Sequence, residues 1–168
     1  GRRSGDGDAW FRIGALKLFA DGTLGSRTAA MLEPWDDVPG TGMTLIAPAG
    51  LAEIVARAAA QGMACAIHAI GAAAVRNALD AFEACPASRS LALPARIEHV
   101  QLLHESDLPR FAALGVAASM QPQHCVTDIE AARLAWGART PRSYPWRALL
   151  DSGALLAFGS DAPVEPPS

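Results

Sequence analysis

The chain has 168 residues, of which 51% are apolar and 18% charged, and its formal net charge is −3. This length suits one domain over residues 1–168, and the apolar content supports a packed core rather than a disordered chain. There is no apolar run of the ~20 residues that a membrane helix needs, no signal-peptide pattern, and no Lys/Arg cluster typical of nucleic-acid binding. We therefore expect a small-molecule partner, with no nucleic acid and no membrane.

Two residue types carry further information about the cell compartment and the chemistry. Cys65, Cys85 and Cys125 form an odd set without paired spacing, which argues against a disulfide framework and indicates the reducing cytoplasm. Lys17 is the only lysine beside 13 arginines. Because lysine can lose its proton when buried and arginine cannot, a retained lysine suggests a chemical role, with chance as the alternative.

Apolar strands and helices are predicted to alternate along the chain. The predicted strands cover residues 12–20, 63–70, 95–100, 116–120 and 154–159. The predicted helices cover residues 51–60, 72–84, 105–114 and 146–151, with Ser106 as a possible N-cap of the third. A long loop over 21–50 and a less regular segment reaching Pro145 complete the pattern. Such alternation predicts parallel βαβ units in an α/β fold, with buried strands in a parallel sheet covered by helices.

Polar residues lie at the carboxyl end of each predicted strand, where parallel α/β folds collect their chemistry. They are Lys17 and Asp21, His68, Glu98 and His99, Gln121, Gln123 and His124, and Ser160 and Asp161. Each alone has an ordinary structural explanation, since a histidine in a strand is more often a hydrogen-bonded core residue than a ligand. His104, in a polar stretch before a helix, is expected to be structural or solvent-exposed.

Two imidazoles, a carboxylate and the sole lysine at successive strand ends form a set of metal-ligand types. Imidazole and carboxylate suit a divalent ion such as Zn²⁺, which lowers the pKa of bound water to about 7 and supplies hydroxide near neutral pH. A buried, neutral lysine could add an oxygen ligand once CO₂ carbamylates its amine. The residues themselves therefore favour a metal site at the carboxyl ends of the predicted strands.

Six short strings occur in an order that resembles the amidohydrolase superfamily. They are GALKLFADGTLGSRTAAM, AIHAIGAAAV, RIEHVQLL, SMQPQH, SYPWRALLDSG and FGSDAPVEPP. The resemblance is to the amidohydrolase-3 branch, which includes YtcJ-like proteins and N-substituted formamide deformylases, and it extends from about residue 12 to residue 168. It implies a metal-dependent (β/α)8 TIM barrel, of which this chain would hold strands four to eight.

The resemblance also implies roles for individual residues. Lys17, His68, His99 and Asp161 correspond to the metal ligands of strands four, five, six and eight, with a carbamylated lysine bridging two ions in the family. Asp161 corresponds to the catalytic general base that activates water and carries its proton. Substrate-side roles are implied for Asp21, Ser26, Arg27, Gln121 and His124.

The sequence departs from the family pattern in two places. Ala72 stands where the family usually has Asp after the His-Ala-Ile-Gly turn, so a contact near the metal site or helix start is expected to be missing. The His-X-His pair of the family's first strand has no counterpart among the four histidines, and the β-sandwich is absent too. We therefore interpret the chain as the C-terminal part of an amidohydrolase barrel, weakly active or inactive by itself, whose full-length parent would hold one or two ions.

Three functions are compatible with these observations. The first is hydrolysis of carbon–nitrogen bonds other than peptide bonds, in an amide, formamide or cyclic amide, by metal-activated hydroxide. The second keeps the barrel but deaminates or cleaves esters, with the choice made by loop 21–50 and the segment around Trp136. The third is a non-catalytic flavodoxin-like α/β binding module, which would hold no metal at these residues. A partial barrel also exposes two sheet edges, so we expect a homo-oligomer or other self-association.

Overall fold

A parallel sheet of five strands forms the centre of the molecule. The computed structural model describes residues 1–166, so Pro167 and Ser168 of the C-terminal family string lie outside the described part. The strands are β1 (Leu16–Phe19), β2 (Cys65–Ala69), β3 (Arg96–His99), β4 (Ala117–Met120) and β5 (Leu156–Phe158). All four strand pairs are parallel, and the spatial order β1-β2-β3-β4-β5 follows the chain.

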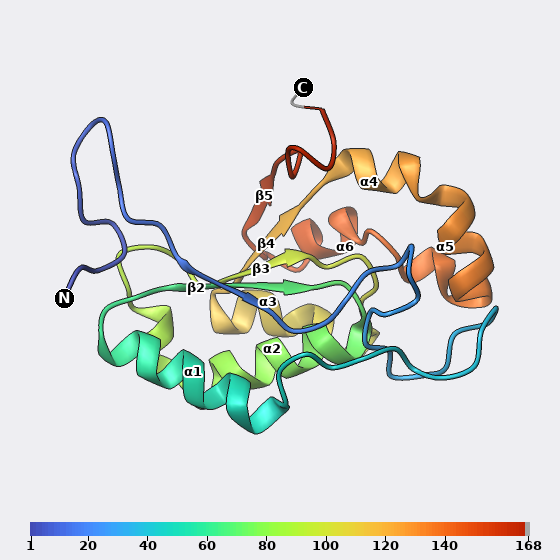
Figure 1. The fold of residues 1–168 in the computed structure, drawn as a ribbon, viewed down its shortest axis with the longest axis horizontal. Coiled ribbons are helices and arrows are strands. Elements are labelled where there is room, and N and C mark those ends of the chain that lie inside the picture. Colours follow the sequence, from blue (N-terminus) through green and yellow to red (C-terminus); the bar gives the residue numbers. More distant parts are fainter. Residues whose placement is uncertain (167–168) are drawn as a thin grey trace.

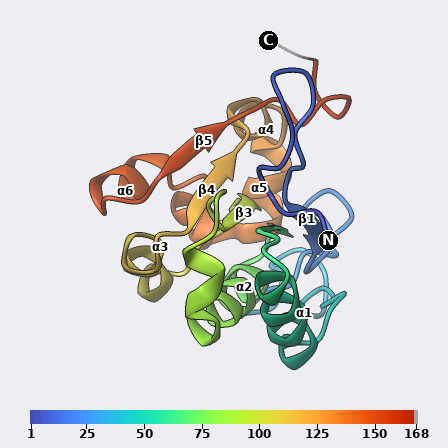
Figure 2. The same ribbon diagram turned by 90° about the vertical axis from the view of Figure 1, so that its left-hand side faces the viewer.

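The helices cover one side of this sheet. Helices α1 (Pro48–Ala60), α2 (Ala72–Ala84), α3 (Leu108–Leu114) and α6 (Trp146–Asp151) lie along its outer side, and the sheet curves from β1 to β5 (Figures 1 and 2). Two short 3-10 helices, η1 (Pro86–Arg89) and η2 (Glu105–Asp107), lead from α2 and into α3. Sequential strand order with helices outside is the arrangement of a (β/α)8 barrel, here in part, which confirms the predicted fold class.

The strand register decides which side chains face the helices. Leu18, Ile67, Ile97, Ala118 and Leu156 lie beside one another across the sheet, and all five pack into the main apolar core under the helices. Because successive side chains alternate between faces, the neighbouring positions must point to the other side. Those positions include Lys17, His68, Arg96, Glu98 and Ser119, so the face away from the helices is polar.

A second, smaller core lies at the carboxyl ends of the strands. Leu24, Met31 and Trp35 of the long loop pack there against Trp136 and Ala132 of α5 (Ile129–Trp136). Before α5 comes α4 (Pro122–Thr127), and after it the 3-10 helix η3 (Gly137–Arg142). The loop 21–50 thus has a packed inner surface although it forms no regular element before Pro48.

Several sequence predictions need correction. The first strand is not a buried strand over 12–20, because β1 is short and only Leu18 among its residues is partly buried. β5 is likewise exposed, since each of these strands pairs on one side only among residues 1–166. The segment predicted as irregular up to Pro145 contains α4, α5 and η3. Ser106 does not cap the third helical segment; the Nδ1 atom of His104 accepts the Ser106 N–H instead, which confirms a structural role for His104.

The order of the strands also decides against the flavodoxin-like alternative. Flavodoxin-like sheets have the order 2-1-3-4-5, in which the chain reverses its direction of progress across the sheet. This sheet progresses in one direction from β1 to β5. A non-catalytic module of that architecture is therefore excluded. Among residues 1–166, no helix is long and apolar enough to span a membrane.

We expect the three thiols to react at very different rates in the folded chain. Cys65 is 2% exposed, and burial raises the pKa of its thiol to about 11. The reactive thiolate is therefore scarce at pH 7.5, whereas Cys85 and Cys125 are only partly buried. Brief treatment with iodoacetamide followed by peptide mass spectrometry should label Cys85 and Cys125 first and Cys65 only after denaturation. Equal labelling of all three in the native chain would contradict the packing of β2.

Candidate functional site

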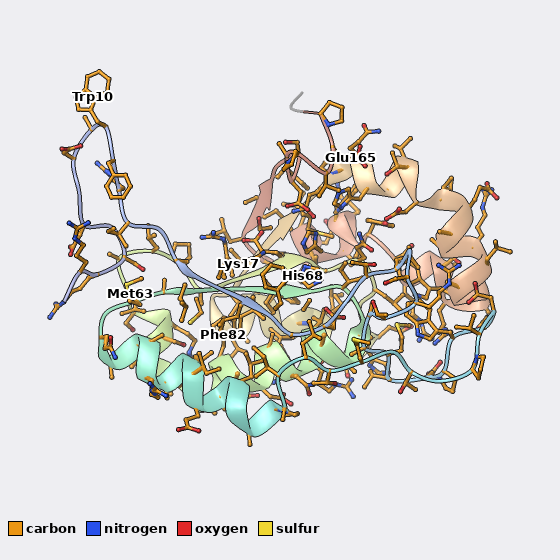
Figure 3. All side chains as sticks on the ribbon, viewed as in Figure 1. Trp10, Lys17, Met63, His68, Phe82 and Glu165 are labelled. Atoms are coloured by element: carbon orange, nitrogen blue, oxygen red, sulfur yellow. The ribbon has the colours of Figure 1, made fainter. Side chains whose placement is uncertain are left out.

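A cavity of about 540 Å³ opens at the carboxyl ends of the strands. Lys17 from β1, His68 from β2, His99 from β3 and Asp161 after β5 all line it. Lys17 and His68 lie on the side of the sheet away from the helix residue Phe82 (Figure 3). The four residues predicted as metal ligands, which are spread over 145 positions of sequence from residue 17 to residue 161, therefore reach one space.

His68 is held in one orientation by its hydrogen bonds. Its Nε2 atom lies 2.9 Å from the carbonyl oxygen of Gly22 and 3.5 Å from Oδ1 of Asp21. Because a carbonyl oxygen only accepts, Nε2 must carry the proton, and a neutral ring then has its lone pair on Nδ1. Burial lowers the pKa of His68, so the ring is neutral at neutral pH and suited to bind a cation.

Asp21 lies behind His68 and ties three segments together. Its Oδ2 atom accepts hydrogen bonds from the backbone N–H groups of Ala30 and Gly71, and Oδ1 accepts one from Ile70. The side chain is completely enclosed, and burial raises its pKa to about 6 although the three N–H donors oppose this. The carboxylate thus accepts the N–H groups of Ile70 and Gly71, the two residues directly before α2.

His99 reaches the cavity because the backbone bends at the end of β3. In an ideal strand it would point with Ile97 toward the helices, but its φ is +78° and that of Val100 is +47°. Positive φ is unfavourable for both residue types, and for a β-branched valine in particular. The bend places the His99 ring 4.6 Å from that of His68 and 5.8 Å from that of His124, measured between centroids.

The environment of His99 favours a neutral imidazole. Burial, followed by the nearby His68 and Lys17, lowers the pKa of His99 to about 3. Its Nδ1 atom is buried and has no hydrogen-bond partner in the described part of the chain. A buried nitrogen without a partner is costly, so this atom is suited to bind a ligand or ion.

Lys17 is more open than its sequence context predicts. It lies on the polar face, over the Phe19 ring at 5.1 Å, and no described segment covers it, so it is exposed rather than buried. Partial desolvation nevertheless lowers the pKa of its amine, against the opposing carboxylates of Glu98 and Asp161. Asp161, in the turn that follows β5, has a φ of +57° and is also exposed.

The residues predicted to bind substrate fall into two groups. His124 lines the main cavity, and Gln121 lines an adjoining one of about 610 Å³ together with Lys17 and Asp161. Ser26 and Arg27 do not line either cavity. Ser26 bonds to the hydroxyls of Thr23 and Thr28, and Arg27 pairs with Asp37 at 2.6 Å.

Two residues of the cavity wall were not singled out from the sequence. Gln101 follows His99 by two positions, and Asp128 directly precedes α5. The first could have been found by extending the search past the end of the third strand. The second could not, because an Asp before a helix is normally read as an N-cap.

Side chains of metal-ligand types line this cavity, but among the described residues they do not form a complete metal cage. Within residues 1–166, no group of three His, Cys, Asp or Glu side chains is close enough to hold a metal ion. A carbamate on Lys17 would add oxygen atoms to the donors that line the cavity. The cavity therefore offers a partial set of donors whose chemistry suits a divalent ion.

Comparison with known proteins identifies a family and several relatives that this chain resembles. A family model described as the amidohydrolase family matches residues 1–168. The chain is 35% identical over 159 residues to YtcJ of Bacillus subtilis, covering 94% of this chain and 30% of that protein. It is 36% identical over 159 residues to Protein LONG AFTER FAR-RED 3 of Arabidopsis thaliana, covering 92% of this chain and 27% of that one.

A solved structure agrees with the sequence relatives. An uncharacterized metal-dependent hydrolase from Pyrococcus furiosus superposes with a TM-score of 0.86 at 36% identity, covering 98% of this chain and 34% of that one. The chain thus spans about a third of the length of the proteins it matches.

Proposed function

The chain belongs to the amidohydrolase family, and we propose that it is the C-terminal part of a metal-dependent hydrolase of carbon–nitrogen bonds other than peptide bonds. The substrate would be an amide, formamide or cyclic amide. The observation that carries the proposal is the convergence of Lys17, His68, His99 and Asp161 on one cavity from four different strand ends. The similarity to a metal-dependent hydrolase from Pyrococcus furiosus supports the same class.

Zn²⁺ is the ion we propose for this site. Two imidazoles kept neutral by burial and a carboxylate are donors that suit it, and the unpartnered Nδ1 of His99 has no other use among the described residues. Held there, a divalent ion would lower the pKa of a bound water and polarise the substrate carbonyl. His68 and His99 would hold it, oriented respectively by Gly22 with Asp21 and by the bend at Val100.

Asp161 and Lys17 have separate proposed tasks. Asp161 takes a proton from the attacking water and returns it to the leaving nitrogen, as a general base and then a general acid. Lys17 in its neutral form would add through its nitrogen to the carbon of CO₂ and release one proton, leaving a carbamate whose oxygen atoms are ligands. Partial desolvation favours the neutral amine that this step requires.

Metal binding by the purified, tag-free chain tests the proposal. We expect equilibrium dialysis to show weak Zn²⁺ binding, weakened a further tenfold or more in a Lys17→Ala, His99→Ala double variant. The binding is expected to be weak because the described side chains do not close a cage. His104→Ala, which removes a partly buried histidine that does not line this cavity, is the matched control and should bind Zn²⁺ as the parent chain does.

The outcome separates the proposal from adventitious binding. Equal Zn²⁺ affinity in the double variant and the parent chain would remove Lys17 and His99 from the site. Hydrolysis is expected to need a longer protein that supplies a His-X-His strand upstream. In such a protein a formamide, a cyclic amide, an ester and an aromatic amine, offered in parallel, would identify the bond cleaved.

We further propose that the chain self-associates through β1 and β5. Each of these strands pairs on one side only among the described residues, and Phe19, Leu155 and Phe158 are all more than half exposed. Light scattering at micromolar concentration should give a mass above the monomer. Leu155→Lys with Phe158→Lys should shift the chain toward monomer, whereas Leu134→Lys on α5 should not. A monodisperse monomer of the parent chain would contradict the proposal.

A further inference from the structure

One wall of the cavity consists of polar groups that the proposed hydrolysis does not use. Gln101 in the loop after β3, His124 on α4 and Asp128 before α5 all line it. They come from three segments that are consecutive around the carboxyl ends of β3 and β4. None of them belongs to the four proposed metal ligands, so their common position calls for a different explanation.

Gln101 is placed in the wall by a strained backbone. The positive φ angles of His99 and Val100 precede it, and its own carbonyl oxygen accepts the N–H of Tyr144 at 2.7 Å. The side chain is almost completely enclosed, because the residue is 3% exposed, yet its Oε1 atom has no partner among residues 1–166. A buried amide oxygen left without a donor is costly, so the site is suited to an incoming donor.

His124 is also buried, and both of its ring nitrogens lack hydrogen-bond partners among the described residues. The residue is 7% exposed. A neutral imidazole has one nitrogen that accepts and one that donates. The ring stacks on that of His99, which keeps it at the boundary between the proposed metal ligands and the polar wall.

The Asp128 carboxylate lines the cavity and does not cap α5. The residue is the N-cap residue of α5, but its carboxylate makes no capping hydrogen bond. Its Oδ2 atom instead accepts the hydroxyl of Tyr144 at 3.1 Å. Burial and the adjacent carboxylate raise the pKa of Tyr144, so its hydroxyl remains a donor to Asp128.

Most of the charged side chains that line the cavity are acidic. Asp128, Asp161 and Glu165 contribute carboxylates, while Lys17 is the one Lys or Arg that lines the cavity within residues 1–166. Lys17 lies on β1, and the polar wall follows β3 and β4, so the wall itself has acceptors and negative charge without a resident cation. A negatively charged ligand group would meet repulsion there, and an apolar group would leave Gln101 and His124 unpaired.

We propose that Gln101, His124 and Asp128 form the recognition site for a protonated amine of the substrate. This deepens the proposed function: the substrate would be an amide or formamide that carries a second, basic nitrogen at a distance from the bond cleaved. An ammonium group has three N–H donors, which match the Gln101 oxygen, the accepting nitrogen of His124 and the Asp128 carboxylate.

Three small probes that share one ring test this inference without hydrolysis or metal. Benzylamine, benzamide and benzoate are positive, neutral and negative at pH 7, and each can be titrated into the 168-residue chain by NMR with a chelator present. We expect benzylamine to bind at least fivefold more tightly than the other two and to shift the His124 ring resonances. Asp128→Asn should weaken benzylamine binding at least fivefold and change the affinity for benzamide less than twofold.

Two further variants protect the test against misfolding and non-specific charge effects. Gln101→Met keeps the size of the side chain, removes the acceptor, and should also weaken benzylamine. Glu130→Gln removes an exposed carboxylate of α5 outside the cavity and should change nothing. Benzoate binding as tight as benzylamine, or equal benzylamine binding by the parent chain, Asp128→Asn and Gln101→Met, would overturn the inference.

The measured preference for benzylamine does not depend on the proposed hydrolysis. Loss of Zn²⁺ binding concerns Lys17 and His99, whereas the amine preference is measured in metal-free protein. An amine preference without any Zn²⁺ binding would leave this inference standing and reject the proposed metal site, and the reverse result would do the opposite.

Discussion

Replacing Asp21 by alanine is expected to lower the free energy of unfolding of the chain by about 3–5 kcal/mol. The carboxylate is the partner of the buried N–H groups of Ala30, Ile70 and Gly71, and each buried donor left without a partner costs about 1–3 kcal/mol. Urea unfolding followed by tryptophan fluorescence measures the difference. We also expect the Gly22 carbonyl and His68 ring to lose their fixed geometry, so Zn²⁺ affinity should fall in the same variant.

A matched control is available in the same loop. Asp37 pairs with Arg27 near the surface, and Asp37→Ala should lower the urea midpoint far less than Asp21→Ala, because a partly exposed ion pair contributes less than a buried carboxylate with three N–H partners. A stable Asp21→Ala chain that had lost only substrate binding would contradict the structural role and restore the substrate-side role predicted from the sequence.

Gly71→Ala is expected to destabilise the chain by about 3 kcal/mol, at the upper end of overpacking effects. A Cβ atom there would lie 2.0 Å from the carbonyl oxygen of Ala30 and 2.6 Å from its carbonyl carbon, both backbone atoms that cannot rotate away. The same oxygen accepts the N–H of Ala73 at 3.0 Å, so moving Ala30 would also disturb the first turn of α2. Urea unfolding should show the loss, together with weaker protection of the α2 amides in hydrogen exchange.

The comparison for this variant is a glycine without such a neighbour. Gly50 lies inside α1, where the nearest atom to an added Cβ would be Ile46 Cγ2 at 3.7 Å. Gly50→Ala should therefore stabilise the chain by about 0.5–1 kcal/mol through its helix propensity. A similar small gain in Gly71→Ala would show that the loop and α2 are not in contact as described.

The contacts of Asp21 and Ala30 explain how the long loop supports the candidate site. Asp21 and Ala30 link the segment after β1 to the start of α2, and His68 lies directly against that link. The loop 21–50 was predicted to select the substrate. Its residues Thr23, Leu24 and Gly25 do line the cavity, while Asp21 stabilises the ring that faces it.

Local sequence patterns were sufficient for most of the elements. The helices predicted over 72–84 and 146–151 coincide with α2 and α6, because apolar spacing and the following Pro86 or Gly153 mark their ends. The segment before Pro145 was missed, because α4 and η3 have only six residues each and show no clear apolar period. The exposure of β1 was also missed, since an apolar pattern does not say whether a covering segment is present.

The sequence by itself determined the alternation of strands and helices, the family resemblance and the four residues expected to meet at the strand ends. These follow from local periodicity and from residue identity, which need no knowledge of distant contacts. Only the tertiary structure decided the strand order, the role of Asp21 and the turning of His99 and Gln101 into the cavity. The physical reason is that these features depend on backbone angles and on hydrogen bonds between residues as far apart as Asp21 and Gly71. Local sequence patterns carry no information about such contacts.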